Sequence, residues 1–245
     1  MRKLVAAILV CWACSSPVGD AQSAGAATVV PKGLKVRALP GGNGVLEVTA
    51  LTLRKRDTTS ELLAALKNNG NVPACHAAFA VELFDAGEQS LAAGITGLLT
   101  QQFYRRTDGS GTIAACVAPG ERTLAAITDL PPELVVEDVS VVVYRCPYSA
   151  LDVERIDGMV VERVEALARG GGIALAGTLV SSFKVSVNRP SVTVFVVDAV
   201  GRPLDFAIGT GDVQIPPGGK WDFETSAVEV SGAEYLAYPA GALGN

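Results

Sequence analysis

The sequence predicts an all-β protein with two tandem β-sandwich domains after an N-terminal signal segment. The first observation is the run at residues 192–198, in which alternate side chains would point to opposite faces of a strand. Both rows of this run are largely apolar, so we expect a central strand covered on both faces. The second observation is a copy of the pattern at residues 79–85. The third is a Pro-Gly corner after each copy, at Pro119-Gly120 and Pro217-Gly218.

An internal repeat sets the predicted organisation. An offset of 113 residues lays residues 61–95 on residues 174–208 without a gap, and an offset of 98 then aligns the two Pro-Gly corners. The change of offset places an insertion in the first copy, at about residues 96–111. Residues 60–70 have the local propensity of a capped helix, but the copy at residues 177–182 has a strand-like sequence. We therefore predict a strand in both places.

The repeat and the turn signals give the predicted domain boundaries. Residues 1–26 form the signal segment and leader, residues 27–148 the first sandwich, residues 149–158 a linker, and residues 159–245 the second sandwich. The hydrophobic fraction of 49% is ample for packed cores. The formal net charge of -5 gives no electrostatic basis for binding nucleic acid, so we expect none among the partners.

The N-terminal residues have the features of an export signal. Arg2 and Lys3 precede an apolar segment, residues 4–13, that is too short to span a bilayer. Two endings fit the sequence: acylation of Cys14, as in a bacterial lipoprotein, or cleavage near residues 21–26 to release an exported protein. We expect export to the periplasm, the envelope membrane or the exterior. Contact with the membrane would come only through a lipid anchor.

Three cysteines remain after the signal segment. Cys75, Cys116 and Cys146 allow one disulfide and one free thiol in an oxidising compartment. If the strands alternate in direction, Cys116 and Cys146 fall at one end of the sandwich and Cys75 at the other. The sequence therefore predicts a Cys116–Cys146 disulfide with Cys75 unpaired.

The sequence contains few groups that catalyse reactions. His76 is the only histidine, which excludes a site with several histidine ligands, and its alanine neighbours favour a packing role. No Gly-x-Ser-x-Gly motif is present, and the glycine-rich segments lack the context of a phosphate-binding loop. We predict no metal site and no cofactor.

The insertion carries the residues that most resemble a binding surface. Phe103, Tyr104, Arg105 and Arg106 combine aromatic and arginine side chains, the composition of interface anchors, in a loop that exceeds the repeat. The alternative is that Phe103 packs on the sandwich while the arginines stay in water. A second basic run, at residues 54–56, ends a predicted strand, and we interpret it as protection of a sheet edge.

The repeated motifs resemble those of the FxLYD domain. In the second copy the matching residues are Gly177, Ser181, residues 192–198, Gly201, Pro217-Gly218 and Phe223. In the first copy they are Asn68, residues 79–85, Gly87 and Pro119-Gly120, with Ala64 in place of the glycine. The resemblance implies an immunoglobulin-like β-sandwich of the kind found in exported bacterial proteins, without a fixed catalytic set.

Two functional hypotheses follow. The first is a non-enzymatic exported protein of the cell envelope, whose two sandwiches bind a secreted or envelope protein or serve in structural assembly. The alternative is a hydrolase with an atypical site formed by His76 and the insertion at residues 96–111.

Overall fold

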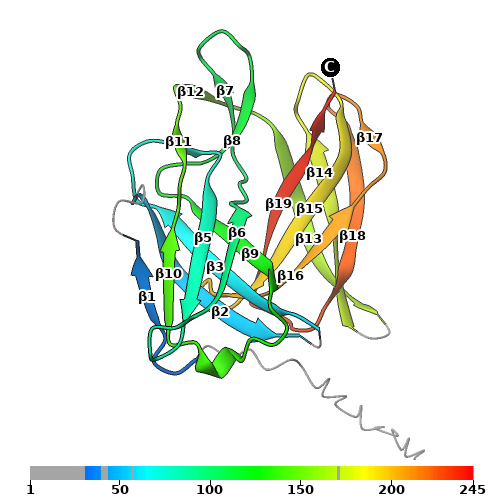
Figure 1. The fold of residues 1–245 in the computed structure, drawn as a ribbon. Helices are drawn as coiled ribbons and strands as arrows, with labels where there is room; N and C mark the ends of the chain where they lie inside the picture. The colour runs from blue at the N-terminus through cyan, green and yellow to red at the C-terminus, as the bar shows by residue number, and fades with distance from the viewer. Residues whose placement is uncertain (1–30, 40–43, 57, 170–171, 245) are drawn as a thin grey trace, which may run out of the picture.

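The computed structural model describes residues 31–39, 44–56, 58–169 and 172–244. Within these residues the chain forms strands β1 to β19, one short 3₁₀ helix, η1, and no α-helix, which confirms the all-β class (Figure 1). None of the described helical residues forms a segment long and apolar enough to cross a membrane. The predicted signal segment and Cys14 lie outside the described residues.

The N-terminal half, residues 31–150, is a sandwich of two sheets. The sheets have the strand orders β1-β10-β5-β6 and β2-β3-β9. Leu62 and Leu66 from one sheet meet Phe79, Val81 and Leu83 from the other in a continuous core, because alternate residues of a strand share a face. The bounds are β1 Lys35–Ala38, β2 Leu46–Lys55, β3 Ser60–Asn68, β5 Ala78–Phe84, β6 Ser90–Gly97, β9 Arg122–Leu130, η1 Val136–Asp138 and β10 Val141–Arg145.

The C-terminal half, residues 159–244, is built in the same way. One sheet has the order β13-β14-β18; in the other, β15 pairs with β16, β17 and β19. Val192, Val194 and Val196 face Leu175 and Leu179 across the core. The bounds are β13 Met159–Arg169, β14 Gly172–Ser181, β15 Val187–Val197, β16 Pro203–Thr210, β17 Gln214–Ile215, β18 Lys220–Val228 and β19 Glu234–Leu243.

A fifth sheet of short strands stands on top of the N-terminal half in Figure 1, in the order β11-β4-β8-β7-β12. The insertion contributes β7 (Phe103–Arg106), which pairs with β8 (Ile113–Val117). Residues 149–158, the predicted linker, contain β11 (Ser149–Ala150) and β12 (Val153–Ile156). These strands pair with β4 (Ala74–Cys75) and β7, so this segment is held by the N-terminal half.

The offsets found in the sequence also relate the strands. β6 and β16 differ by 113 residues at both ends, and β9 and β18 differ by 98 at both ends. Val81 and Val194, which the first offset aligns, lie opposite Tyr144 of β10 and Ala237 of β19. Ser60–Asn68 is a strand, as the repeat predicts and against its local helix propensity. One strand has no counterpart: β1 pairs parallel to β10, whereas β19 has β15 as its only strand partner among the described residues.

The two halves meet through the outer faces of β3 and β9 and of β15 and β19. Leu63, Ala65 and Leu124 pack against Phe195 and Tyr238 there. This contact explains why both rows of β15 are apolar, and it confirms that the run at residues 192–197 is central and covered on both faces.

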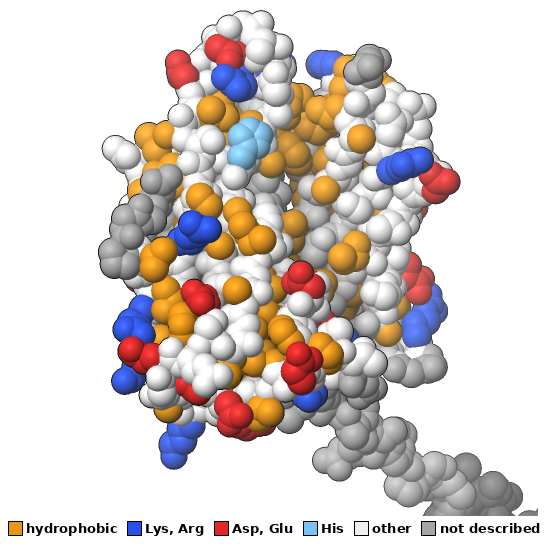
Figure 2. All heavy atoms as spheres, in the orientation of Figure 1, with side chains coloured by type: hydrophobic (Ala, Val, Ile, Leu, Met, Phe, Trp, Pro, Cys, Tyr) orange, Lys and Arg blue, Asp and Glu red, His pale blue; other side chains and the backbone are white. Residues whose placement is uncertain are grey.

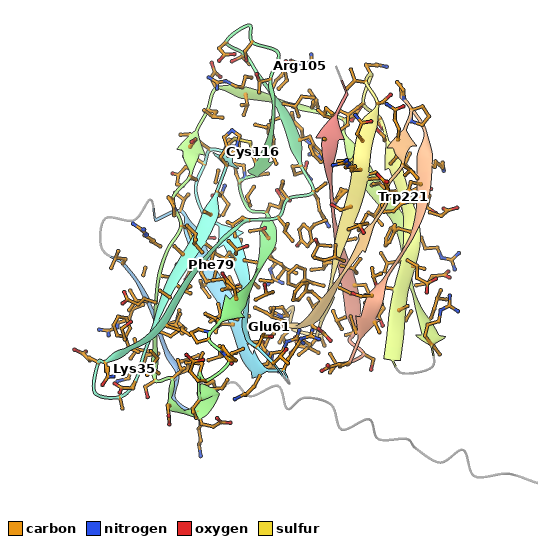
Figure 3. The ribbon with its side chains drawn as sticks, turned by 45° about the vertical axis from the view of Figure 1, so that its right-hand side comes forward. Lys35, Glu61, Phe79, Arg105, Cys116 and Trp221 are labelled. Carbon is orange, nitrogen blue, oxygen red and sulfur yellow. A yellow bond between two sulfur atoms is a disulfide. The ribbon has the colours of Figure 1, made fainter. Side chains whose placement is uncertain are left out.

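Buried charges lie at the lower end of this contact, where Figure 3 labels Glu61. Arg54 is 2% exposed, and its Nη2 atom lies 2.6 Å from both a Glu61 and an Asp205 oxygen. Arg56 binds the same carboxylates at 3.0 and 2.7 Å. The interpretation of residues 54–56 as edge protection is therefore wrong for Arg54 and Arg56, because both join the two halves through ion pairs with the buried Asp205.

The predicted Cys116–Cys146 disulfide is also wrong, because the structure pairs Cys75 with Cys116, with 4.0 Å between their Cα atoms. Cys75 does not begin the strand that holds Phe79. It belongs to β4, a two-residue strand of the small sheet, where it lies directly opposite Cys116 of β8. The chain changes sheets at His76, whose φ is 49°, so counting strand directions failed. Cys146 is a buried free thiol.

Candidate functional site

The first two residues of the predicted binding surface pack against the rest of the protein. Phe103 is half-buried and makes an edge contact with Phe183, with ring centroids 5.3 Å apart. A Cβ atom on Gly158 would lie 2.3 Å from the Phe103 ring, so the ring closely covers that glycine. Tyr104 is 6% exposed and packs beside the Cys75–Cys116 disulfide. The alternative considered for Phe103, packing on the sandwich, is how it lies.

Arg105 is the one exposed residue of this group, and Arg106 is half-buried like Phe103. Arg105, labelled at the top of Figure 3, lies 3.6 Å from Glu154, and Arg106 lies 2.6 Å from Asp108. These ion pairs are exposed, and pairs of this kind contribute little to stability. Arg105 and Arg106 are thus available to a partner, but without the aromatic neighbours that the sequence placed beside them.

His76 is exposed on the face shown in Figure 2, so it does not have the packing role that its neighbours suggested. Its backbone N–H donates to the Ala115 carbonyl at 3.3 Å, and no described residue hydrogen-bonds to its imidazole. Nor do the described residues contain a group of three or more histidine, cysteine or acidic side chains that could hold a metal ion.

The most distinctive feature is the outer edge of β19. Gly211 N–H donates to the Pro190 carbonyl. This bond shows which residues of β15 direct their backbone N–H and carbonyl groups towards β16. Hydrogen-bonded and non-bonded pairs alternate along antiparallel strands, so Val194 directs its backbone groups to β16. Ala237, opposite Val194 on β19, must therefore point its own N–H and carbonyl away from β15.

The same alternation of backbone direction continues along β19. Tyr235 and Pro239 lie two residues on either side of Ala237, so their backbone groups also face outward. Proline has no N–H to give to a ladder, which agrees with its place on the outward side of an edge strand. Pro239 was the one signal in the sequence that could have marked this edge.

A glutamine side chain meets the edge at its centre. The Gln101 Nε2 atom donates to the Ala237 carbonyl at 2.9 Å. In the N-terminal half, the corresponding carbonyl of Tyr144 accepts from the backbone N–H of Leu39, next to β1, at 2.7 Å. The Gln101 amide therefore gives the Ala237 carbonyl of β19 the hydrogen bond that the segment after β1 gives to the Tyr144 carbonyl of β10. Sequence reasoning missed Gln101, because nothing local connects it to a residue 136 positions away.

This edge lines a groove of about 430 Å³ between β19 and β13, at the place where Gln101, Gln102 and Arg155 bring the two halves together. The surface is visibly hollowed between them in Figure 2. The wall opposite β19 is the first part of β13, whose pairing with β14 shifts register between Val161 and Arg163. The lining residues are Gln101, Gln102, Arg155, residues 159–164, Tyr235, Ala237 and Pro239.

The charges around the groove are matched within the chain. Glu162 binds Lys220 at 3.0 Å, and Arg163 forms an ion pair with Glu165. Burial raises the pKa of Glu121, while the backbone N–H groups of Ala118 and Gln101 and the nearby Arg155 guanidinium act in the opposite direction. The groove thus presents backbone hydrogen-bonding groups, amides and aliphatic side chains instead of an uncompensated charge.

Comparisons with known proteins give little. No family model matches the chain, and no curated protein matches it. Among solved structures it is similar to red sea bream transglutaminase, with 11% identity and a TM-score of 0.21 over 78% of this chain. The match covers 27% of that enzyme, and a score of this size carries no argument about function.

Proposed function

We propose that this chain is a non-enzymatic binding protein of the bacterial cell envelope, exported by its N-terminal segment. Its two halves are immunoglobulin-like domains similar to the FxLYD domain, and the groove between them binds another polypeptide. The single observation that carries the proposal is the outward edge of β19, which presents backbone groups to a groove of about 430 Å³.

The physical argument concerns unpaired backbone groups. A strand edge offers a row of N–H and carbonyl groups to any extended chain, and proteins usually cover or block such edges. Here the edge lies in a recess between β19 and β13, with one carbonyl bound by Gln101. A recessed edge is protected from general aggregation while it stays open to a segment that fits the groove.

The position of the two halves favours binding over a loose tether. The apolar contact around Phe195 and the buried charges around Asp205 fix one half against the other. Gln101, Gln102 and Arg155 are therefore held beside the two walls, β19 and β13, and a preorganised site loses less free energy when it binds. Export, with either acylation at Cys14 or cleavage near residues 21–26, belongs to the same proposal.

Site-specific photo-crosslinking in envelope fractions tests this function. A photoreactive residue at Val160, which is 57% exposed on the groove wall, should crosslink a protein partner. The matched control is Val213, which is 47% exposed and lies outside the groove lining. Capture at neither position, or equal capture at both, would contradict the proposal. Mass spectrometry of the mature N-terminus would show cleavage and acylation together.

The placement of His76 gives no observation in favour of the hydrolase alternative. Its imidazole is exposed and has no hydrogen-bonded carboxylate or hydroxyl among the described residues. A general base is normally oriented by such a partner.

A further inference from the structure

We infer that the edge of β19 accepts an extended, uncharged segment of a partner polypeptide as a further strand, parallel to β19. The inference rests on the proposed function and names the kind of partner that the groove binds. The mode of recognition is strand addition, in which backbone hydrogen bonds hold the ligand and alternate side chains give selectivity.

The molecule itself shows what covers such an edge. In the N-terminal half, β1 lies parallel to β10, with Val36 opposite Val142. Lys35 N–H donates to the Ser140 carbonyl at 2.9 Å, and Leu39 N–H donates to Tyr144 at 2.7 Å. Tyr144 corresponds to Ala237, because their partners Val81 and Val194 are aligned by the repeat. The outward groups of β19 therefore stand where β10 holds a parallel strand.

The segment of this chain that corresponds to β1 is β12, and β12 already pairs with another strand. β1 precedes β2, the first strand of the three-stranded sheet, and β12 similarly precedes β13 in the C-terminal half. β12 pairs with β7 of the insertion, with Arg155 opposite Tyr104, and so does not pair with β19. The insertion thus withdraws the strand that would close the sheet and leaves only the Gln101 side chain on the edge.

The surroundings of the edge define the occupant's chemistry. Glu162 and Arg163 each form an ion pair within the chain. A charged side chain directed into the groove would bring an unmatched charge into a partly desolvated site, which is unfavourable. The aliphatic wall, with Val160, Val161 and Val164, suits β-branched or other aliphatic residues at alternating positions of the ligand.

The test uses random decapeptides displayed on phage, selected against the whole protein. Selected peptides should have aliphatic residues at alternating positions and no charge between them. They should bind Ala237→Pro at least tenfold more weakly than Ala237→Ser. Proline removes the outward N–H and places its ring in the groove, whereas serine keeps the N–H. Because that N–H faces away from β15, the ladder to β15 keeps all its bonds.

A second measurement does not depend on how the proline variant folds. In the wild-type protein, a selected peptide should slow amide exchange at Tyr235 and Ala237 and leave Leu236 and Tyr238 unchanged, since the latter two already face β15. Peptides that bind both Ala237 variants equally, a selection that yields no binder, or protection elsewhere only would overturn the inference.

The outcomes separate this inference from the proposed function. If the Val160 crosslink captures a partner equally well in Ala237→Pro and Ala237→Ser, the binding function stands and the strand-addition inference fails. If wild-type protein captures no partner, the function fails, whatever peptides were selected. A crosslink from Val160 to a second copy or to residues 1–30 of the same chain would overturn the assignment of a partner polypeptide.

Discussion

Replacement of Asp205 by asparagine tests whether the buried charges join the two halves. Asp205 is fully buried, and its carboxylate binds Arg54 and Arg56 at 2.6 and 2.7 Å. It also accepts from the backbone N–H of Glu229 at 2.9 Å. Asparagine has nearly the same shape, so it creates no cavity, but it leaves the two arginines against Glu61 and the more exposed Glu229, which lies 3.5 Å from Arg56.

Loss of one partner from a buried ion pair costs about 3–5 kcal/mol, because the remaining charge stays desolvated. With an m-value of about 2 kcal/mol/M, Asp205→Asn should lower the urea midpoint by roughly 1.5–2.5 M. Unfolding can be followed by far-UV circular dichroism and by Trp221 fluorescence. The control is Asp212→Asn, since Asp212 is exposed and lies 3.9 Å from Arg189. We expect that control to leave the midpoint unchanged.

The double variant Arg54→Met/Asp205→Asn restores the balance of charge, with Arg56 against Glu61. It should lose less stability than the sum of the two single variants, by about 0.5–3 kcal/mol, as expected for residues in direct contact. Equal midpoints for Asp205→Asn and Asp212→Asn, or strict additivity in the double variant, would refute the idea that these charges hold the halves together.

Three further predictions concern the cysteines and the contact between Gly158 and Phe103. Cys75→Ser should cost about 4 kcal/mol in urea unfolding, because the disulfide with Cys116 closes a loop with a separation of 41 residues; peptide mapping that finds Cys116 joined to Cys146 would contradict it. Burial raises the pKa of Cys146 to about 12 from 9.0, so the free energy of unfolding should fall as pH rises through this range, and Cys146→Ala should show a smaller fall. Gly158→Ala should destabilise by about 1–3 kcal/mol through its clash with Phe103, and the loss should shrink in the Phe103→Ala background.

The strand plan could be predicted because the repeat overrides local propensity. Residues 60–68 favour a helix locally, yet both of their faces are buried, Leu62 and Leu66 in the core and Leu63 against the other half. A copy with a strand-like sequence was enough to reveal this. The apolar outer row of residues 192–197 likewise indicated a face covered on the outside, although not what covers it.

The failures share one physical cause, which is pairing between residues far apart in the chain. Cys75 pairs with Cys116 because a two-residue strand leaves the main sheet, and a strand so short has no periodicity to detect. Arg54 resembles a solvated strand end until Asp205, 151 residues away, is placed beside it. The aromatic residues of the insertion were singled out for their composition, but composition cannot tell an exposed anchor from a buried one.

The candidate site was missed for a related reason. A free edge is a property of the assembled sheet, and only Pro239 hinted at it in the sequence. Gln101 stands in the predicted insertion, next to residues that were considered, but its role depends on the carbonyl of Ala237.

Amide exchange in the protein without ligand tests the central claim, that β19 has an open edge, most directly. Tyr235 and Ala237 should exchange much faster than Leu236 and Tyr238, whose N–H groups face β15. Tyr144 provides an internal reference, since it corresponds to Ala237 and faces β1. The account predicts that the amide of Tyr144 is protected from exchange and that the amide of Ala237 is not. Equal protection at Tyr144 and Ala237 would show that the edge is already paired and would contradict the account.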